Sequence, residues 1–216
     1  MNSRPHRPTV IPEGAGSHAR WQKGSSQSSS QSSSQSSSQS SSVSAEVHPW
    51  HLLPDERAHL ERRYDTALRL DPPLPSAESR AALVDAVKRG ALAIASGHRA
   101  VPNRTKDLEM AIAEPGASAL ALTLPLLCAL FTPLELARAA SLLPAQILGL
   151  ADRGRVDVGA RADLAIYRTD RNDVVDAALV GARSPANPWL GQRTAGRVVG
   201  TIANGVVAFH RAGDAA

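Results

Sequence analysis

The feature that most limits what this chain can fold into is a Ser/Gln repeat over residues 25–42. The repeat contains no apolar residue, and its glutamines recur at every fourth position from Gln27 to Gln39. A segment that cannot bury apolar surface cannot offset the conformational entropy that it would lose on ordering. We therefore expect residues 1–42 to form a disordered N-terminal tail, and the folded part to begin at Val43.

The residues after the repeat predict a parallel α/β unit. Residues 43–48 are typical of a short strand, and residues 91–96 of a small apolar strand. Between them, Ser76 is the expected N-cap of a helix and Gly90 its expected end. The apolar stripe of this helix is formed by Ala81, Leu83, Val84 and Val87. A strand, a helix and a second buried strand in this order favour a βαβ unit.

The middle of the chain predicts three further helices. Residues 119–130 are almost entirely apolar, so we expect a helix that is buried on most sides. Thr132 is followed by proline and then by Glu135, which is a strong helix-start pattern. Pro144 is expected to open another short helix, which closes at Gly149.

The C-terminal part has a β pattern instead. Residues 163–168 alternate apolar and polar side chains, as a half-buried strand does. Asn204 and Gly205 stand between two β-branched runs, which predicts a hairpin with a type I′ turn. We expect the chain to end in a small β element.

Charge and motif content exclude several classes of function. The net charge is +4, but most of it falls before Val43, where four basic residues accompany one acid. The other basic residues are scattered without interleaved aromatics, so we expect no nucleic-acid partner. There is no phosphate loop, and Ser96-Gly97-His98 lacks the pattern of a nucleophile elbow. No stretch has the length and apolar character of a membrane span, so no membrane partner is expected.

The single cysteine, Cys128, indicates the compartment. One cysteine cannot form an internal disulfide, which fits a reducing environment. Its apolar neighbours predict that Cys128 is a small buried core residue. The N-terminus lacks the apolar centre of a secretory signal, so we expect a cytoplasmic protein.

Six segments in a fixed order carry a resemblance to a known family. Three of them read AEVHPWHLL at 45–53, YDTALRLDPPL at 64–74 and IASGHRAV at 94–101. The others are 106–126 with its Pro-Gly pair, 144–164, and 184–199 with NPWLG. In this order they resemble the C-terminal half of dihydroorotase, in the amidohydrolase superfamily. The resemblance implies an α/β fold: the C-terminal part of a (β/α)₈ TIM-type barrel, plus a small C-terminal β element.

The resemblance also implies an organisation and a site. It divides the chain into a tail over 1–42, a partial amidohydrolase-like barrel over 43–150 and a β-rich segment over 151–216. The residues that match the family's substrate pocket, and that we expect to be a remnant of it, are Asp71, His98, Pro115 and Gly116.

The residues needed for the family's chemistry are expected to be missing. Dihydroorotases use zinc at the C-terminal ends of the barrel strands to activate water against a cyclic amide. Their aspartate at the end of the eighth strand, which holds metal and moves a proton, aligns with Gly97. Their substrate-binding histidine aligns with Val101, and a loop asparagine with Asp71. The other ligands would lie before residue 43, in the Ser/Gln repeat, so we expect a truncated barrel with no catalytic residue and no metal.

Three functions remain open at this point. The first is a non-catalytic dihydroorotase-like protein of pyrimidine biosynthesis, for which the resemblance to degenerate family members implies a scaffold role and aspartate transcarbamylase as partner. The second is a gene fragment without a function of its own. The third is an active zinc-dependent dihydroorotase completed by another chain, which Gly97 opposes.

Overall fold

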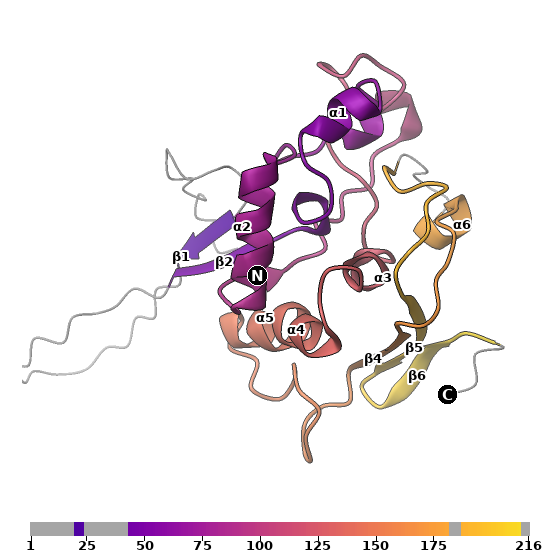
Figure 1. Ribbon diagram of the computed structural model, residues 1–216. Helices are drawn as coiled ribbons and strands as arrows, with labels where there is room; N and C mark the ends of the chain where they lie inside the picture. The colour runs from indigo at the N-terminus through magenta and orange to yellow at the C-terminus, as the bar shows by residue number, and fades with distance from the viewer. Residues whose placement is uncertain (1–19, 24–42, 182–186, 213–216) are drawn as a thin grey trace, which may run out of the picture.

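A computed structural model of the chain describes residues 20–23, 43–181 and 187–212. Its central unit is β2 (Val43–Val47), α2 (Ala77–Lys88) and β3 (Ala93–Ile94) (Figure 1). The two strands are parallel, with Glu46 paired to Ala93. The predicted βαβ unit is confirmed, although the second strand is shorter than the expected 91–96. In the described part of the chain, β2 and β3 are the only strands that pair in parallel. The described residues therefore contain a segment of a parallel sheet and do not form a closed barrel.

The helix that joins the two strands has the ends that the sequence predicts. The Ser76 hydroxyl accepts a hydrogen bond from the Ser79 N–H at 3.1 Å, which caps the first turn. Gly90 follows the last turn with a φ of +76°, the left-handed conformation that glycine adopts most easily. Within the predicted stripe Val87 is fully buried, but Ala81 is exposed. The stripe is therefore shorter than expected: Leu83 and Val84 are half-buried against the core, and Ala81 is not part of it.

A strand within the expected tail extends the parallel pair. Residues of β1 (Arg20–Lys23) pair antiparallel with β2, giving the sheet order β1-β2-β3. The expectation of a disordered tail does not hold at these four positions, where β2 offers an open edge to pair with. The Ser/Gln repeat itself lies outside the described residues.

Short helices surround this sheet. The segment that precedes α2 contains η1 (Pro49–His51), α1 (Arg57–Glu61) and η2 (Thr66–Leu68). After β3 come η3 (Asn103–Thr105), α3 (Thr123–Leu127), α4 (Pro133–Ala137), the π-helical turn η4 (Arg138–Leu142) and α5 (Leu143–Ile147). None of the helices in the described ranges is long and apolar enough to cross a membrane.

The predicted helix over residues 119–130 is corrected to α3 alone. Pro125 lacks a backbone N–H and so fits only the first turn of a helix, which prevents α3 from starting much earlier. Leu120, expected inside, is 70% exposed in the preceding turn. By contrast, the start at Thr132 is confirmed as a capping box with Glu135.

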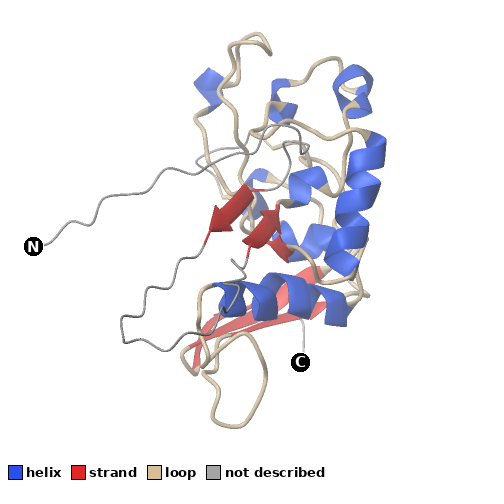
Figure 2. Cartoon of the chain, turned by 90° about the vertical axis from the view of Figure 1, so that its left-hand side faces the viewer, coloured by secondary structure: helices blue, strands red, loops and turns tan. Residues whose placement is uncertain are grey.

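The C-terminal part is a meander of three antiparallel strands. These are β4 (Leu164–Arg168), β5 (Arg197–Ala203) and β6 (Val206–His210), with α6 (Ala177–Val180) between the first two. Asn204 and Gly205 have φ values of +51° and +78°, so the predicted type I′ turn is confirmed. Figures 1 and 2 show this sheet towards the end of the molecule opposite to α1.

Residues 43–150 and the described residues beyond 150 share their buried clusters. One cluster joins Trp50 and Leu68 to Val175 and Trp189, with the two indole rings stacked at a centroid distance of 4.8 Å. A second cluster lies under β2, α2 and α4, where Tyr167 of β4 also packs. Cys128 packs there too, partly buried, and burial raises the pKa of its thiol. Residues beyond 150 therefore have no separate core in the described structure.

Candidate functional site

The segments that follow β2 and β3 lie side by side, because parallel strands end at the same edge of a sheet. They bring His48 and Gly97 into contact. An ideal Cβ on Gly97 would lie 2.5 Å from Cγ of His48, closer than real side chains approach, and Gly97 has a φ of +58°. Trp50 completes the contact by donating from Nε1 to the Gly97 carbonyl at 3.4 Å. The His48 imidazole therefore occupies the space into which a side chain at position 97 would extend.

The residues at this strand edge do not fit the zinc site that the resemblance implies. No group of three or more His, Cys, Asp or Glu side chains that could hold a metal occurs among the described residues. His51 is buried and donates from Nε2 to the Pro72 carbonyl at 2.9 Å, so this nitrogen has a structural partner. The rings of His48 and His51 are 5.5 Å apart between centroids. A catalytic zinc site needs about three protein ligands in fixed geometry, and the described residues at this edge do not supply them.

His98, one of the predicted pocket residues, organises the turn before α3. Its ring is exposed, and Nδ1 accepts hydrogen bonds from the N–H groups of Ala119, at 3.1 Å, and Leu120, at 3.4 Å. An Nδ1 that accepts places the ring proton of neutral His98 on Nε2. The geometry gives His98 a positioning role for the backbone.

Gly116, with Pro115 before it, allows two backbone segments to approach closely. Gly116 has a φ of +141° and donates its N–H to the Arg69 carbonyl at 3.0 Å. A Cβ at this position would lie 2.8 Å from the Arg99 carbonyl oxygen, so glycine is required. Ala117 accepts from the Arg99 N–H at 3.0 Å, which holds the 98–99 and 116–119 segments together.

The remaining predicted positions do not complete a pocket. Asp71 is exposed in the loop before α2, and Val101 is buried at 2% exposure. The structure thus brings the segments of His98 and Gly116 together, whereas Asp71 and Val101 lie in different surroundings. The predicted pocket residues Asp71, His98, Pro115 and Gly116 are not among the residues that line the three hollows found on the described part of the chain.

Lys106 is a buried charged residue that sequence reasoning missed. Its Nζ donates to the carbonyls of Thr66, at 3.0 Å, and Arg69, at 2.9 Å, and the Thr66 hydroxyl donates to the Lys106 carbonyl at 2.6 Å. Burial, followed by the nearby Arg69 guanidinium, lowers the pKa of the Lys106 ammonium to about 8. The polar stretch around position 106 has no pattern that distinguishes this lysine from an exposed one. Through these hydrogen bonds, Lys106 fixes the η2 segment to the loop that leads to Gly116.

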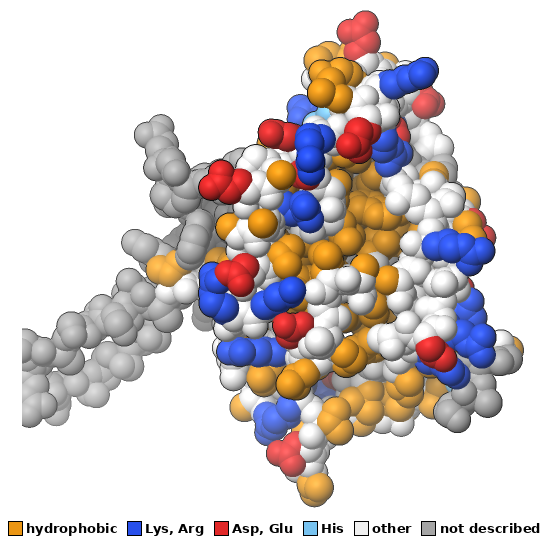
Figure 3. All heavy atoms as spheres, in the orientation of Figure 1, with side chains coloured by type: hydrophobic (Ala, Val, Ile, Leu, Met, Phe, Trp, Pro, Cys, Tyr) orange, Lys and Arg blue, Asp and Glu red, His pale blue; other side chains and the backbone are white. Residues whose placement is uncertain are grey.

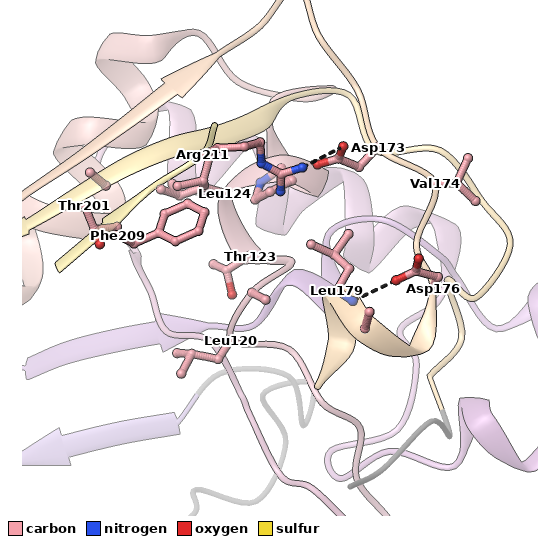
Figure 4. A pocket seen from close by; sticks show the side chains of 15 residues that line it. Leu120, Thr123, Leu124, Asp173, Val174, Asp176, Leu179, Thr201, Phe209 and Arg211 are labelled. Atoms are coloured by element: carbon pink, nitrogen blue, oxygen red, sulfur yellow. Dashed lines mark hydrogen bonds and ion pairs between the residues drawn. The ribbon is translucent and has the colours of Figure 1, made fainter. Parts of the chain in front are cut away.

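A concave surface lies elsewhere, between α3, α6 and the C-terminal sheet (Figure 4). It is a groove of about 670 Å³, with Leu120 and Leu124 on one wall and Phe209 of β6 on another. Arg211 and Asp173 form an ion pair of 3.3 Å at its rim. Apolar side chains gather on this face of the molecule in Figure 3, over the region where Figure 1 places α3 and the C-terminal sheet.

Several of the large apolar side chains that line the groove are exposed to solvent. Leu120 is 70% exposed, Val174 49% and Phe209 43%. Contiguous apolar patches of this kind commonly mark sites of contact with other proteins. Sequence reasoning missed the groove because its walls come from five separate segments of the chain.

Comparisons with known proteins identify relatives of this chain. The model of the amidohydrolase family matches residues 128–209. A dihydroorotase of Pelobacter propionicus is 34% identical over 156 residues, which cover 69% of this chain and 37% of that protein. A dihydroorotase of Geobacter sp. is 36% identical over 154 residues, which cover 68% of this chain and 36% of that protein. A dihydroorotase of Aquifex aeolicus is 28% identical over 210 residues, which cover 94% of this chain and 49% of that protein.

Two solved structures match this chain in fold. The D-hydantoinase of Thermus sp. matches with a TM-score of 0.67 at 23% identity, over 76% of this chain and 39% of that one. The L-hydantoinase of Arthrobacter aurescens matches with a TM-score of 0.68 at 24% identity and the same coverage. The chain therefore spans less than half the length of these relatives, and it shares the fold of the matching part.

Proposed function

We infer that this chain is a dihydroorotase-like protein of the amidohydrolase family, that it acts in pyrimidine biosynthesis, and that it does not hydrolyse dihydroorotate. The premise is its kinship with dihydroorotases, which the family match and the relatives at 34% and 36% identity support. Kinship does not by itself carry activity, because function depends on the residues of the site.

The observation that carries the proposal is the contact between Gly97 and His48. The family resemblance matches position 97 to the aspartate that binds metal and transfers a proton, and the glycine found here offers neither a ligand nor a base. The imidazole of His48 fills the adjoining space, so the site has no room for that carboxylate.

The direct test is an assay of the purified full chain with dihydroorotate, in the presence and absence of added zinc. We expect ring opening at the uncatalysed rate under both conditions, while a catalytically competent dihydroorotase, assayed in parallel, turns over. Hydrolysis by this chain that a chelator abolishes would contradict the proposal and favour an active hydrolase.

A scaffold role for aspartate transcarbamylase is the finer part of the proposal. The family resemblance suggests this partner, and the exposed apolar groove is the surface on which we expect the contact. Its apolar walls and the Asp173–Arg211 pair at the rim match the usual arrangement of a protein interface, with an apolar centre and a polar border.

We expect the chain to elute together with aspartate transcarbamylase in size-exclusion chromatography, and Phe209→Glu to weaken this association at least tenfold. A carboxylate at position 209 would be desolvated by the partner, whereas in the free chain this side chain is 43% exposed and tolerates the change. Leu134→Glu is the matched control, because Leu134 is 79% exposed on α4, away from the groove. Separate elution of the wild-type proteins would refute the partner but leave the non-catalytic assignment standing.

A further inference from the structure

A hollow of about 230 Å³ lies beside α1, apart from the groove between α3 and the C-terminal sheet (Figure 1). The apolar side chains of Leu68, Leu70 and Met110 line it, together with the polar side chains of His59 and Arg69. Leu68 and Leu70 are buried in a core cluster, and Met110 packs against that cluster. An apolar floor that the core holds in place, with a few polar groups beside it, is the usual composition of a small-molecule site.

The backbone of Arg69 is held in place, whereas its side chain has no partner. The Arg69 carbonyl accepts from Lys106 Nζ at 2.9 Å and from the Gly116 N–H at 3.0 Å. Its guanidinium makes no hydrogen bond or ion pair with any residue in the described ranges, and Nε is buried. A guanidinium is always charged and carries five N–H donors, so burying part of it without a partner is unfavourable. A negatively charged acceptor is the partner that this side chain requires.

The acids of this region are already paired with other cations. Asp65 forms an ion pair with Arg62, and Glu114 forms one with Arg99 at 3.6 Å. The Lys106 ammonium donates to backbone carbonyls and adds positive charge beside the guanidinium in the hollow. The charges around the hollow therefore favour an anion from outside the described residues.

His59 contributes a second buried polar atom. Its Nδ1 has no hydrogen-bond partner among the described residues, and its ring stacks on Tyr64 at a centroid distance of 6.4 Å. Burial lowers the pKa of the His59 imidazole, which keeps the ring neutral at neutral pH. A neutral imidazole can carry its proton on Nδ1 and donate a hydrogen bond from there.

We propose that this hollow binds a small organic anion, which consists of a carboxylate on a compact apolar body. The carboxylate accepts hydrogen bonds from Arg69 and His59, and the apolar body packs against Leu68, Leu70 and Met110. For a ligand of about nine non-hydrogen atoms, such as benzoate, the expected Kd is on the order of 1 mM. The proposal is independent of dihydroorotate hydrolysis and of the contact with aspartate transcarbamylase.

Met110 gives the test a specific reporter, because Met1 and Met110 are the two methionines of the sequence. The full chain is labelled with ¹³C at the methionine methyl groups and titrated with benzoate, benzamide and acetate. Benzamide keeps the ring without the charge, and acetate keeps the charge without the ring. We expect benzoate to shift the Met110 signal saturably, and the other two compounds to bind about tenfold more weakly or less.

Three variants locate the binding groups. Arg69→Met removes the charge, and His59→Phe removes the ring nitrogens but keeps a ring against Tyr64. Arg104→Met is the matched control, because Arg104 is exposed on η3 and does not line the hollow. We expect benzoate to bind about tenfold more weakly to the Arg69→Met chain, about threefold more weakly to the His59→Phe chain, and unchanged to the control. Far-ultraviolet circular dichroism checks that each variant is folded.

Two results would overturn the proposal. An unshifted Met110 signal in the wild type at about 20 mM benzoate, well above the expected Kd, would exclude the site. Equal binding of benzoate and benzamide, or equal benzoate affinity in the Arg69→Met and Arg104→Met chains, would exclude recognition of the charge. The comparison of benzoate with benzamide uses the wild-type chain, so it decides this point even where Arg69→Met does not fold.

Discussion

Gly97→Asp, which restores the family's carboxylate, is expected to destabilise the chain by about 2–4 kcal/mol and to confer no hydrolysis. Two costs add at this position. A non-glycine residue at a φ of +58° is strained, and its Cβ would meet the His48 ring at 2.5 Å. The measurement is urea unfolding followed by circular dichroism, together with the dihydroorotate assay.

A matched control separates the two costs. Gly191 has a φ of +77° and nothing within 4 Å of an added Cβ. Gly191→Asp should therefore lower the free energy of unfolding by only about 1 kcal/mol, from backbone strain. Combining Gly97→Asp with His48→Ala should cost less than the sum of the single changes, because the imidazole no longer blocks the new side chain. A Gly97→Asp chain as stable as wild type would show that the site has room for the carboxylate and would reopen the question of activity.

The elements that sequence predicted best are those set by local chemistry. The Ser76 cap, the Thr132–Glu135 capping box and the Asn204-Gly205 turn each follow from hydrogen bonds or φ values within a few residues. The helix predicted over 119–130 was too long, because the apolar pattern hides the effect of Pro125. The pairing of β1 with β2 depends on an edge that exists only after folding.

The candidate site was predictable in identity but not in arrangement. The resemblance singled out Gly97 and His98, and the structure places both beside the end of β3. That His48 packs against Gly97 could not be read from the sequence, because the two residues follow different strands, which only folding brings together. The burial of Lys106 likewise depends on the carbonyls of Thr66 and Arg69, which folding brings to it.

Trp189→Ala is expected to lower the free energy of unfolding by about 3–5 kcal/mol, since it removes a buried indole and leaves a cavity against Trp50. Trp189 also lies in the segment that fixes the C-terminal part to the rest: its N–H donates to Asn187 Oδ1 at 2.9 Å, and Asn187 Nδ2 donates to the Ser118 carbonyl. The measurement is urea unfolding by far-ultraviolet circular dichroism, because the substitution alters the fluorescence.

The form of that unfolding curve tests how the chain is organised. Val175, Trp189 and Trp50 share one core cluster, so residues 43–150 and 151–212 should unfold in a single transition in the wild type. Trp189→Phe keeps an aromatic ring against Trp50, so it should retain more than half of the free energy of unfolding that Trp189→Ala loses. A Trp189→Ala chain that loses less than about 1 kcal/mol, or a wild type that unfolds in two transitions, would show that the C-terminal sheet is stable without the parallel unit.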